Sequence, residues 1–286
     1  MTTKARRAAV TYLTTTYPVS QRRACRVVGL ARSRWQHVPA RASDVPLAAA
    51  LRAKAADRPR WGDRRLGILL ARDGWRVNHK RLRRVYRAEG LRLRRSTRRK
   101  PVSVARVPRP VHAGPNTPWI IDFISDAFAT GRTFRTLSVV DACTRECLAA
   151  HVDVSRPSAT VARVLDELAL ARGAPHRVIL DNGPEMIAKA LDAWGYTRRV
   201  ELAFTRRGKP VDNCHMERFH DKLRDECLSL HGFLNLPDAQ HLIAAWREDD
   251  NTVRPHQGLG NRTPAEFALL CMQEYGFESA LTPQPH

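Results

Sequence analysis

Three carboxylates in the second half of the chain have residue types and surroundings that suit a metal site. Asp122 follows the apolar run Trp119–Ile121, where a charged group is costly unless it is paired or bound to a metal. Asp181 directly follows the apolar string VIL, at the kind of strand end where α/β sheets place their ligands. Glu217 comes later, with 35 residues between it and Asp181. The three acids are therefore candidate metal ligands.

Carboxylate oxygens of this kind bind hard divalent cations. Two such ions about 3.5–4 Å apart could activate a water or a hydroxyl group and stabilise the leaving oxygen in phosphoryl transfer. Each acid alone is weak support, since a single acid is more often a helix cap or a surface charge. Other acids near expected strand or helix ends are Asp141, Asp153, Glu185 and Asp212. The set of three, with its spacing, carries the prediction.

Alternating apolar strands and amphipathic helices must position these carboxylates. The expected strands are 119–128, two strands within 132–153 joined by a turn near 141–144, 176–180 and 200–205. The expected helices are 155–173, 185–194 and 213–228. This order predicts an α/β domain with a mixed five-stranded sheet. In the last helix, Met216, Phe219, Leu223 and Cys227 share one stripe, and Glu217 beside it could face the sheet edge.

The charge of the chain is concentrated in its first part. Of the 49 Lys and Arg residues, 30 lie within residues 1–110, against five acids, so this part has a net charge of +25. The remainder has 19 basic and 23 acidic residues, a net charge of −4. A field this one-sided attracts a polyanion, and Arg pairs bidentately with phosphate or guanine. We therefore expect residues 1–93 to bind nucleic acid, with DNA favoured over RNA and a solvated basic segment as the alternative.

Two helix-turn-helix outlines lie in this basic part. In residues 20–35, Ser20 can cap a short helix with an apolar face at Ala24, Val27 and Val28, and Gly29 supplies the turn. In residues 63–90, a first helix carries Leu66, Leu69 and Leu70, and a second starts at Asn78, carries Leu82, Val85 and Tyr86 and ends at Gly90.

The polar face of the helix that follows Asn78 is strongly basic and is the best candidate to enter a major groove, with backbone binding as the alternative. Its cations are Lys80, Arg81, Arg83, Arg84 and Arg87. Residues 94–118 carry five prolines and a basic cluster without a usable period, which indicates a linker. No stretch is long and apolar enough for a membrane span, and six cysteines are too few for a disulfide scaffold. We expect a reduced, cytoplasmic protein.

Five sequence strings together resemble the second-frame protein of the insertion-sequence-three family, within the DDE transposases and integrases. They are RRACRVVGLARSRW, WIIDFISDAFATGRTFRTLSVVDACTRECLA, ILDNGPE, GKPVDNCHMERFHDKLRDECL and NTVRPHQGLGNRTPAEF. The resemblance covers residues 18–268 and implies an RNase H-like catalytic core at 119–270, with a tail at 271–286. It also implies a bacterial, nucleoid-associated protein.

The resemblance implies that Asp122, Asp181 and Glu217 bind two Mg²⁺ ions, with Mn²⁺ as a substitute. Water would release a 3′-hydroxyl at the element end, and that hydroxyl would attack another phosphodiester, with circular forms of the element as products. Asn182 and Gly183 would shape the turn after the second acid. Lys209, in the loop before the last helix, and Arg224 would contact DNA.

The resemblance also implies partners: double-stranded DNA at the element ends and target, a homo-oligomer on DNA, and fusion to an upstream-frame protein by ribosomal frameshifting. The chain has no sustained heptad pattern that could supply a coiled coil. Retroviral integrases add an amino-terminal His/Cys zinc module, but here Cys25 is the only cysteine before the core and His37 and His79 lie far apart, so a four-ligand zinc site cannot be assembled.

The sequence departs from the family pattern at three positions outside the triad. Arg207 replaces the first Pro of Pro-Gly-Lys-Pro, Met186 replaces a Phe, and Asp250 replaces an aromatic residue before the Asn of the NxxRPH string. The rival interpretation is a non-enzymatic DNA-binding regulator that uses the same body as a scaffold. The intact acid triplet favours the enzyme, and a metal-dependent strand-cleavage assay separates the two.

Overall fold

The computed structural model describes residues 1–36, 43–93, 114–155, 158–181, 183, 186–187, 189–205 and 214–275. The chain divides into two compact units, Met1–Ala50 and Leu51–His286. Residues 94–113 of the linker expected at 94–118 lie outside the described residues. So do residues 276–286 of the tail expected at 271–286. The domain boundaries therefore remain predictions.

The first unit is helical, and its helices begin where short polar side chains cap them. Its helices are α1 (Thr3–Thr16), α2 (Gln21–Val28) and α3 (Arg32–Gln36). The Ser20 hydroxyl accepts a hydrogen bond from the backbone N–H of Arg23, and Gly29 ends α2 at a φ of +65°, which glycine adopts without a Cβ clash. The first helix-turn-helix outline is thus present as helices, although its inward face differs from the prediction. Val27 is exposed, because Cys25 takes the inward position beside Ala24.

A second group of helices follows. It consists of α4 (Val45–Asp57), α5 (Asp63–Arg72) and α6 (His79–Ala88). The Asn78 side chain caps α6 by accepting from the backbone N–H of Lys80 at 2.9 Å, as the sequence predicts. All six apolar positions predicted for this helix pair are buried: Leu66, Leu69, Leu70, Leu82, Val85 and Tyr86. Both helices therefore turn their basic residues away from the apolar contact.

The rest of the second unit is built on a five-stranded mixed sheet, which confirms the α/β prediction. Its strands are β1 (Pro118–Ala127), β2 (Thr133–Asp141), β3 (Cys147–Asp153), β4 (Arg177–Leu180) and β5 (Glu201–Phe204). Their order in the sheet is β3-β2-β1-β4-β5. The β1–β2 and β2–β3 pairs are antiparallel, and the β1–β4 and β4–β5 pairs are parallel. β1 is therefore antiparallel to its neighbour on one side and parallel to its neighbour on the other.

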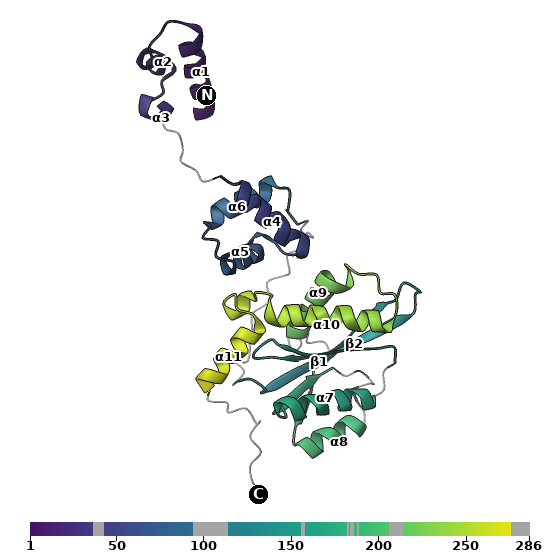
Figure 1. Cartoon of the computed structure of the whole chain (residues 1–286). Helices are drawn as coiled ribbons and strands as arrows, with labels where there is room; N and C mark the ends of the chain where they lie inside the picture. The colour runs from purple at the N-terminus through teal and green to yellow at the C-terminus, as the bar shows by residue number, and fades with distance from the viewer. Residues whose placement is uncertain are drawn as a thin grey trace. The chain divides into compact units, whose positions relative to one another are not determined.

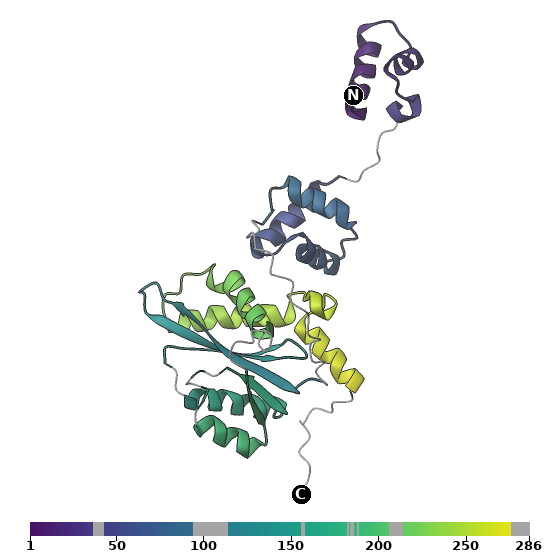
Figure 2. The same ribbon diagram turned by 180° about the vertical axis from the view of Figure 1, so that it is seen from behind.

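Helices cover both faces of the sheet. One face carries α7 (Ser158–Arg172) and α8 (Lys189–Arg198), and the other carries α9 (Cys214–Leu223) and α10 (Leu236–Thr252), as both views show (Figure 1, Figure 2). The chain then forms a short 3-10 turn, η3 (Gln257–Leu259), and α11 (Pro264–Tyr275). Strand alternation divides the core accordingly: Trp119 and Ile121 of β1 face α7 and α8, whereas Ile120 and Ile124 face α9 and α10.

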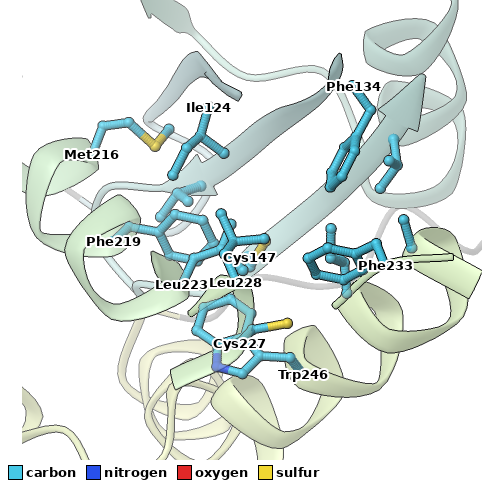
Figure 3. Close-up of a cluster of buried hydrophobic side chains, with 14 of the residues drawn as sticks. Ile124, Phe134, Cys147, Met216, Phe219, Leu223, Cys227, Leu228, Phe233 and Trp246 are labelled. Atoms are coloured by element: carbon cyan, nitrogen blue, oxygen red, sulfur yellow. The ribbon is translucent and has the colours of Figure 1, made fainter. Parts of the chain in front are cut away.

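The α9 face holds the larger aromatic cluster, shown in Figure 3. The predicted stripe Met216, Phe219, Leu223 and Cys227 is buried in it, beside Ile124 and Trp246. Beyond Leu223 the helix continues without a break as a π-helical turn, η2 (Arg224–Leu228). The sequence predicts one helix over 213–228, and its extent agrees with α9 plus η2, but the change of helix type is not predicted.

The helix predicted at 185–194 is displaced. The backbone N–H groups of Met186 and Ile187 both bond to the carbonyl of Gly183, at 2.9 and 3.1 Å, and this turn keeps both residues out of α8, which begins at Lys189. In the part of the chain that the structure describes, no helix combines the length and apolar character needed to cross a membrane. Five described cysteines are free thiols.

Candidate active site

Asp122 and Asp181 occupy equivalent positions on neighbouring parallel strands. The register pairs Ile120 of β1 with Ile179 of β4, and each acid follows its isoleucine by two residues. Neighbouring strands lie about 4.8 Å apart, and residues two apart along a strand face the same side. Because Ile120 and Ile179 both contact the cluster beneath α9, the two acids belong to the α9 face. They stand where β4 ends, the position that α/β sheets use for ligands.

The Asp122 carboxylate is oriented by its own strand. Its Oδ1 accepts a hydrogen bond from the backbone N–H of Phe123 at 2.7 Å, and its side chain is 24% exposed. Its Oδ2 lies 3.8 Å from Nδ1 of His220 on α9, whose Nε2 lies 3.3 Å from Oγ of Ser138. Burial, together with the positive charge of Arg224, lowers the pKa of His220 to about 4. At neutral pH the imidazole is therefore uncharged and does not neutralise Asp122.

Glu217 lies on α9 one turn before His220, so it belongs to the helix that contacts Asp122. Its side chain is exposed. Among the residues that the structure describes, no three His, Cys, Asp or Glu side chains are grouped closely enough to hold a metal ion. The structure thus brings Asp122 and Asp181 to the α9 face of the sheet, where β4 ends, and places Glu217 on the adjoining helix, without closing the three into a formed site.

The turn after Asp181 is partly described. Oδ1 of Asp181 accepts a hydrogen bond from the backbone N–H of Gly183 at 3.2 Å, which agrees with a turn-shaping role for Gly183. Asn182 and Lys209 lie outside the described residues. Arg224 is exposed at the first position of η2.

The basic residues of α6 mostly face outward. Lys80, Arg83, Arg84 and Arg87 are exposed, whereas Arg81 is half-buried. Arg83 lies 3.8 Å from Asp63 at the start of α5. The exposed cations agree with the predicted polar face, and their role in DNA binding stays a prediction.

Comparison with known families divides the chain in a consistent way. Residues 112–210 and 198–264 each match a family described as an integrase core domain. Residues 44–101 match a family described as an HTH-like domain. The first two ranges include all three candidate carboxylates, and the third covers α4, α5 and α6.

Two similar proteins come from insertion elements. Over 252 residues, 87% of this chain and 91% of the relative, the chain is 44% identical to the insertion element IS407 31.7 kDa protein of Burkholderia multivorans. It is 39% identical to the insertion element IS476 39.2 kDa protein of Xanthomonas euvesicatoria over 255 residues, 88% of this chain and 73% of the relative. This chain belongs to the insertion-sequence-three family of transposases. The resemblance stated from the sequence is thereby confirmed.

The fold of the transposase agrees with this membership. A chain in the solved intasome of simian T-cell lymphotropic virus in complex with the PP2A regulatory subunit B56 gamma has a TM-score of 0.50. The sequences are 13% identical, and the match covers 83% of this chain and 77% of that chain. The likeness concerns the fold alone. With the integrase core match, it identifies the catalytic part as an α/β RNase H-like fold.

Sequence reasoning missed a second group of charged residues in the transposase, at the end of α9. Glu226 of η2 has a side chain only 8% exposed, and it accepts hydrogen bonds from three directions. Nε and Nη2 of Arg254 donate to its two oxygens at 2.8 and 2.6 Å, Nη1 of Arg65 donates at 3.0 Å, and Nε1 of Trp61 donates at 3.1 Å. Glu226 therefore joins α5 and Trp61, two residues before it, to the catalytic part.

The charge of Glu226 is held in place by these donors. Burial by itself would raise the pKa of Glu226, but the hydrogen bonds and charge of Arg254, with Arg65 and Trp61, outweigh burial and lower the pKa below its usual value. The only sequence signal for this role is that an acid stands four residues after Lys222 on the same helix, which is more typical of a surface pair.

Asp250, one of the three departures from the family pattern, has a place in the same group. Its side chain is fully buried, and Nζ of Lys222 donates to both of its oxygens at 3.1 and 3.0 Å. Nε of Arg254 lies 3.5 Å from it. Burial would raise the pKa of Asp250, but the charge of Lys222 and contact with His256 and Arg254 hold it far below its usual value. The departure thus supplies the counter-charge for a half-buried lysine. We call Lys222, Glu226, Asp250 and Arg254, with Trp61 and Arg65, the junction cluster.

Proposed function

We propose that this transposase catalyses metal-dependent DNA strand cleavage and strand transfer during transposition of an insertion sequence. The observation that carries the proposal is the register match of Asp122 and Asp181, on the sheet face covered by the helix of Glu217. Two carboxylates side by side repel each other unless a cation lies between them, and the imidazole next to Asp122 is neutral. The pair therefore suits a cationic ligand.

The donor set fits hard divalent ions, since all candidate ligands are carboxylate oxygens. Asp122, Asp181 and Glu217 would hold two Mg²⁺ ions, with Mn²⁺ as a substitute; when bound, such ions lower the pKa of an attacking water and stabilise a leaving oxygen. Of the chain's own residues, Phe123 fixes the orientation of Asp122 through its backbone N–H, and Gly183 does the same for Asp181. Glu217, exposed on α9, completes the set.

The reaction consists of two displacements at phosphorus. In the first, water forms a new P–O bond at the element end, and the bond to the 3′-oxygen breaks, which frees a 3′-hydroxyl. In the second, that hydroxyl attacks another phosphodiester and displaces its 3′-oxygen. No covalent link to the protein forms in either step.

The other predicted roles complete this proposal. Residues 1–93 would bind double-stranded DNA at the element ends, with Lys80, Arg81, Arg83, Arg84 and Arg87 of α6 in contact with it, and Lys209 and Arg224 would touch DNA near the carboxylates. The protein would act in the bacterial cytoplasm at the nucleoid, as a homo-oligomer on DNA, and as a fusion to an upstream-frame protein.

The test is strand cleavage of a plasmid that carries the DNA flanking this reading frame, with Mg²⁺, Mn²⁺ or a chelator. Asp122→Asn should abolish cleavage and joining and leave DNA binding intact. The matched control is Asp126→Asn, four residues further along β1, because Asp126 also accepts a hydrogen bond from the next backbone N–H, at 2.8 Å. Cleavage that survives Asp122→Asn, or that proceeds in the chelator, would refute the proposal.

A further inference from the structure

A cleft of about 1020 Å³ lies within the second unit, beside the junction cluster. Residues of α5 and the start of α6 line one wall, and residues of α9 and of the segment 254–261 line the other. Its lining is rich in cations: Arg64, Arg65, Arg145, Arg218, Lys222 and Arg254. The acids that line it are Asp63 and Asp221.

The cations of the cleft differ in what they contact, and one of them, Arg145, lies against the His215 ring. Arg65 and Arg254 are bound to Glu226, and Lys222 is bound to Asp250, so their charges are largely neutralised within the protein. Arg64 and Arg218 are exposed, and among the described residues neither has a hydrogen-bond or ion-pair partner. These two guanidinium groups, one on each wall, are available to an anionic ligand.

The position of the cleft relates it to the proposed chemistry. Arg218 directly follows Glu217, and His79, which also lines the cleft, is the first residue of α6. The cleft therefore connects the start of the candidate recognition helix with the helix of a candidate catalytic acid. A ligand in it would be a long polyanion that reaches both.

We propose that this cleft binds the sugar-phosphate backbone of a DNA strand between the segment contacted by α6 and the phosphodiester that is cleaved, with Arg64 and Arg218 each contacting a phosphate. This inference rests on the proposed function. A guanidinium group pairs with a phosphate through two parallel hydrogen bonds, and the partly exposed apolar residues Ile68 and Val77, which also line the cleft, offer a surface for the sugars. The junction cluster holds the two walls together, so the cleft is present before DNA arrives.

The experiment measures binding of the full chain to a 30-base-pair duplex, chosen as about three helical turns, by fluorescence anisotropy in chelator over a range of salt concentrations. Arg64→Gln and Arg218→Gln should each weaken binding about threefold, and both together about tenfold, as expected for exposed charge contacts that add. Each substitution should also reduce the slope of log K against log salt by about 0.9. The fold loss caused by each substitution should be the same for duplexes of different sequence, since phosphates carry no base identity.

The matched control is Arg163→Gln. Arg163 is an exposed arginine on α7, on the opposite face of the sheet, where it pairs with Glu167. The Arg163→Gln variant should bind DNA like the unaltered chain, and thermal unfolding should show that all variants remain folded. An unchanged salt slope in the double variant, or an equal loss in Arg163→Gln, would overturn the proposal.

The outcome is separable from that of the proposed function. If Arg64→Gln and Arg218→Gln weaken binding but the unaltered chain cuts no plasmid, the cleft is supported and the catalytic proposal fails. If the unaltered chain cuts the plasmid and the double variant binds like it, the cleft proposal fails and the catalytic one stands.

Discussion

Two clusters of acidic residues, one near each end of the α9–η2 helix, differ in the side chains that surround them. Near its start, Asp122, Asp181 and Glu217 are half-buried or exposed, and His220 beside Asp122 is neutral. Near its end, Glu226 is buried among Arg254, Arg65 and Trp61, and Asp250 is buried against Lys222. Acids that lie against cationic side chains in a buried cluster stabilise the structure, whereas partly exposed carboxylates at matching positions of neighbouring strands are suited to bind a cation from solution.

The largest expected effect is on chemistry at the first group. Asp181→Asn should reduce strand cleavage by about 10³-fold or more, equivalent to ~4 kcal/mol of activation free energy, because it removes a charge from the proposed ion site. The free energy of unfolding should change by less than about 0.5 kcal/mol, since the side chain is not part of a buried ion network. Kinetic and denaturant measurements on the same preparation check both. A large loss of stability instead would place Asp181 in the structural group.

The second prediction concerns the junction cluster, where a substitution should reduce the stability of the chain. Asp250→Asn should lower the free energy of unfolding by about 3 kcal/mol, because it leaves the half-buried Lys222 ammonium without a full counter-charge. Urea denaturation followed by circular dichroism measures this loss. Lys222→Met combined with Asp250→Asn should recover part of it, and a double variant no more stable than Asp250→Asn would show that the pair is not the cause.

Lowering the pH should reduce the stability that Glu226 and Asp250 contribute. The pKa values of Glu226 and Asp250 lie below their usual values of 4.5 and 3.8, so both bind fewer protons in the folded chain than in the unfolded one. Their stabilisation is therefore complete above about pH 5 and is lost as the pH falls through their folded pKa values. Unfolding measured between pH 7 and pH 3 should show a steeper decline in the unaltered chain than in Asp250→Asn. Parallel curves would contradict the assignment.

A smaller effect is expected at Trp61. Trp61→Phe keeps most of the buried ring but removes the Nε1 donor to Glu226, and we expect a loss of about 1 kcal/mol in the free energy of unfolding. The loss is modest because Arg254 still binds both oxygens of Glu226. Trp61→Phe in a Glu226→Gln background should cost less than in the unaltered chain, and equal costs would show that the two side chains are not coupled.

Much of the fold and the first carboxylate group could be predicted from the sequence because both follow local patterns. The stripe of Met216 and Phe219 follows the period of a helix, and the caps at Ser20 and Asn78 follow from hydrogen bonds within three residues. Asp122 and Asp181 follow apolar strands, and their strand positions match in the structure. Whether these acids bind metal ions is untested and stays a prediction.

The parts that escaped prediction depend on contacts between distant segments. Glu226 meets Arg65, 161 residues away in sequence, and no local period signals such a pair. The displaced start of α8 depends on the Gly183 turn and on Met186, which is buried beneath the sheet. No element is predicted over the long helix α10, where the apolar run Leu242–Trp246 is followed directly by the polar residues 247–252.

The contacts of Glu226 limit how freely this transposase could exchange its HTH-like domain with that of a relative. Residues 44–101 match a separate family, and by that match alone they form a self-contained module for building chimaeras. Two donors to Glu226, Trp61 and Arg65, nevertheless lie inside that range, whereas Glu226 and Arg254 lie in the catalytic part. A graft without an indole and a guanidinium at these positions would leave a buried carboxylate with fewer donors. Hybrid elements should therefore arise only when both sides of this contact are inherited together.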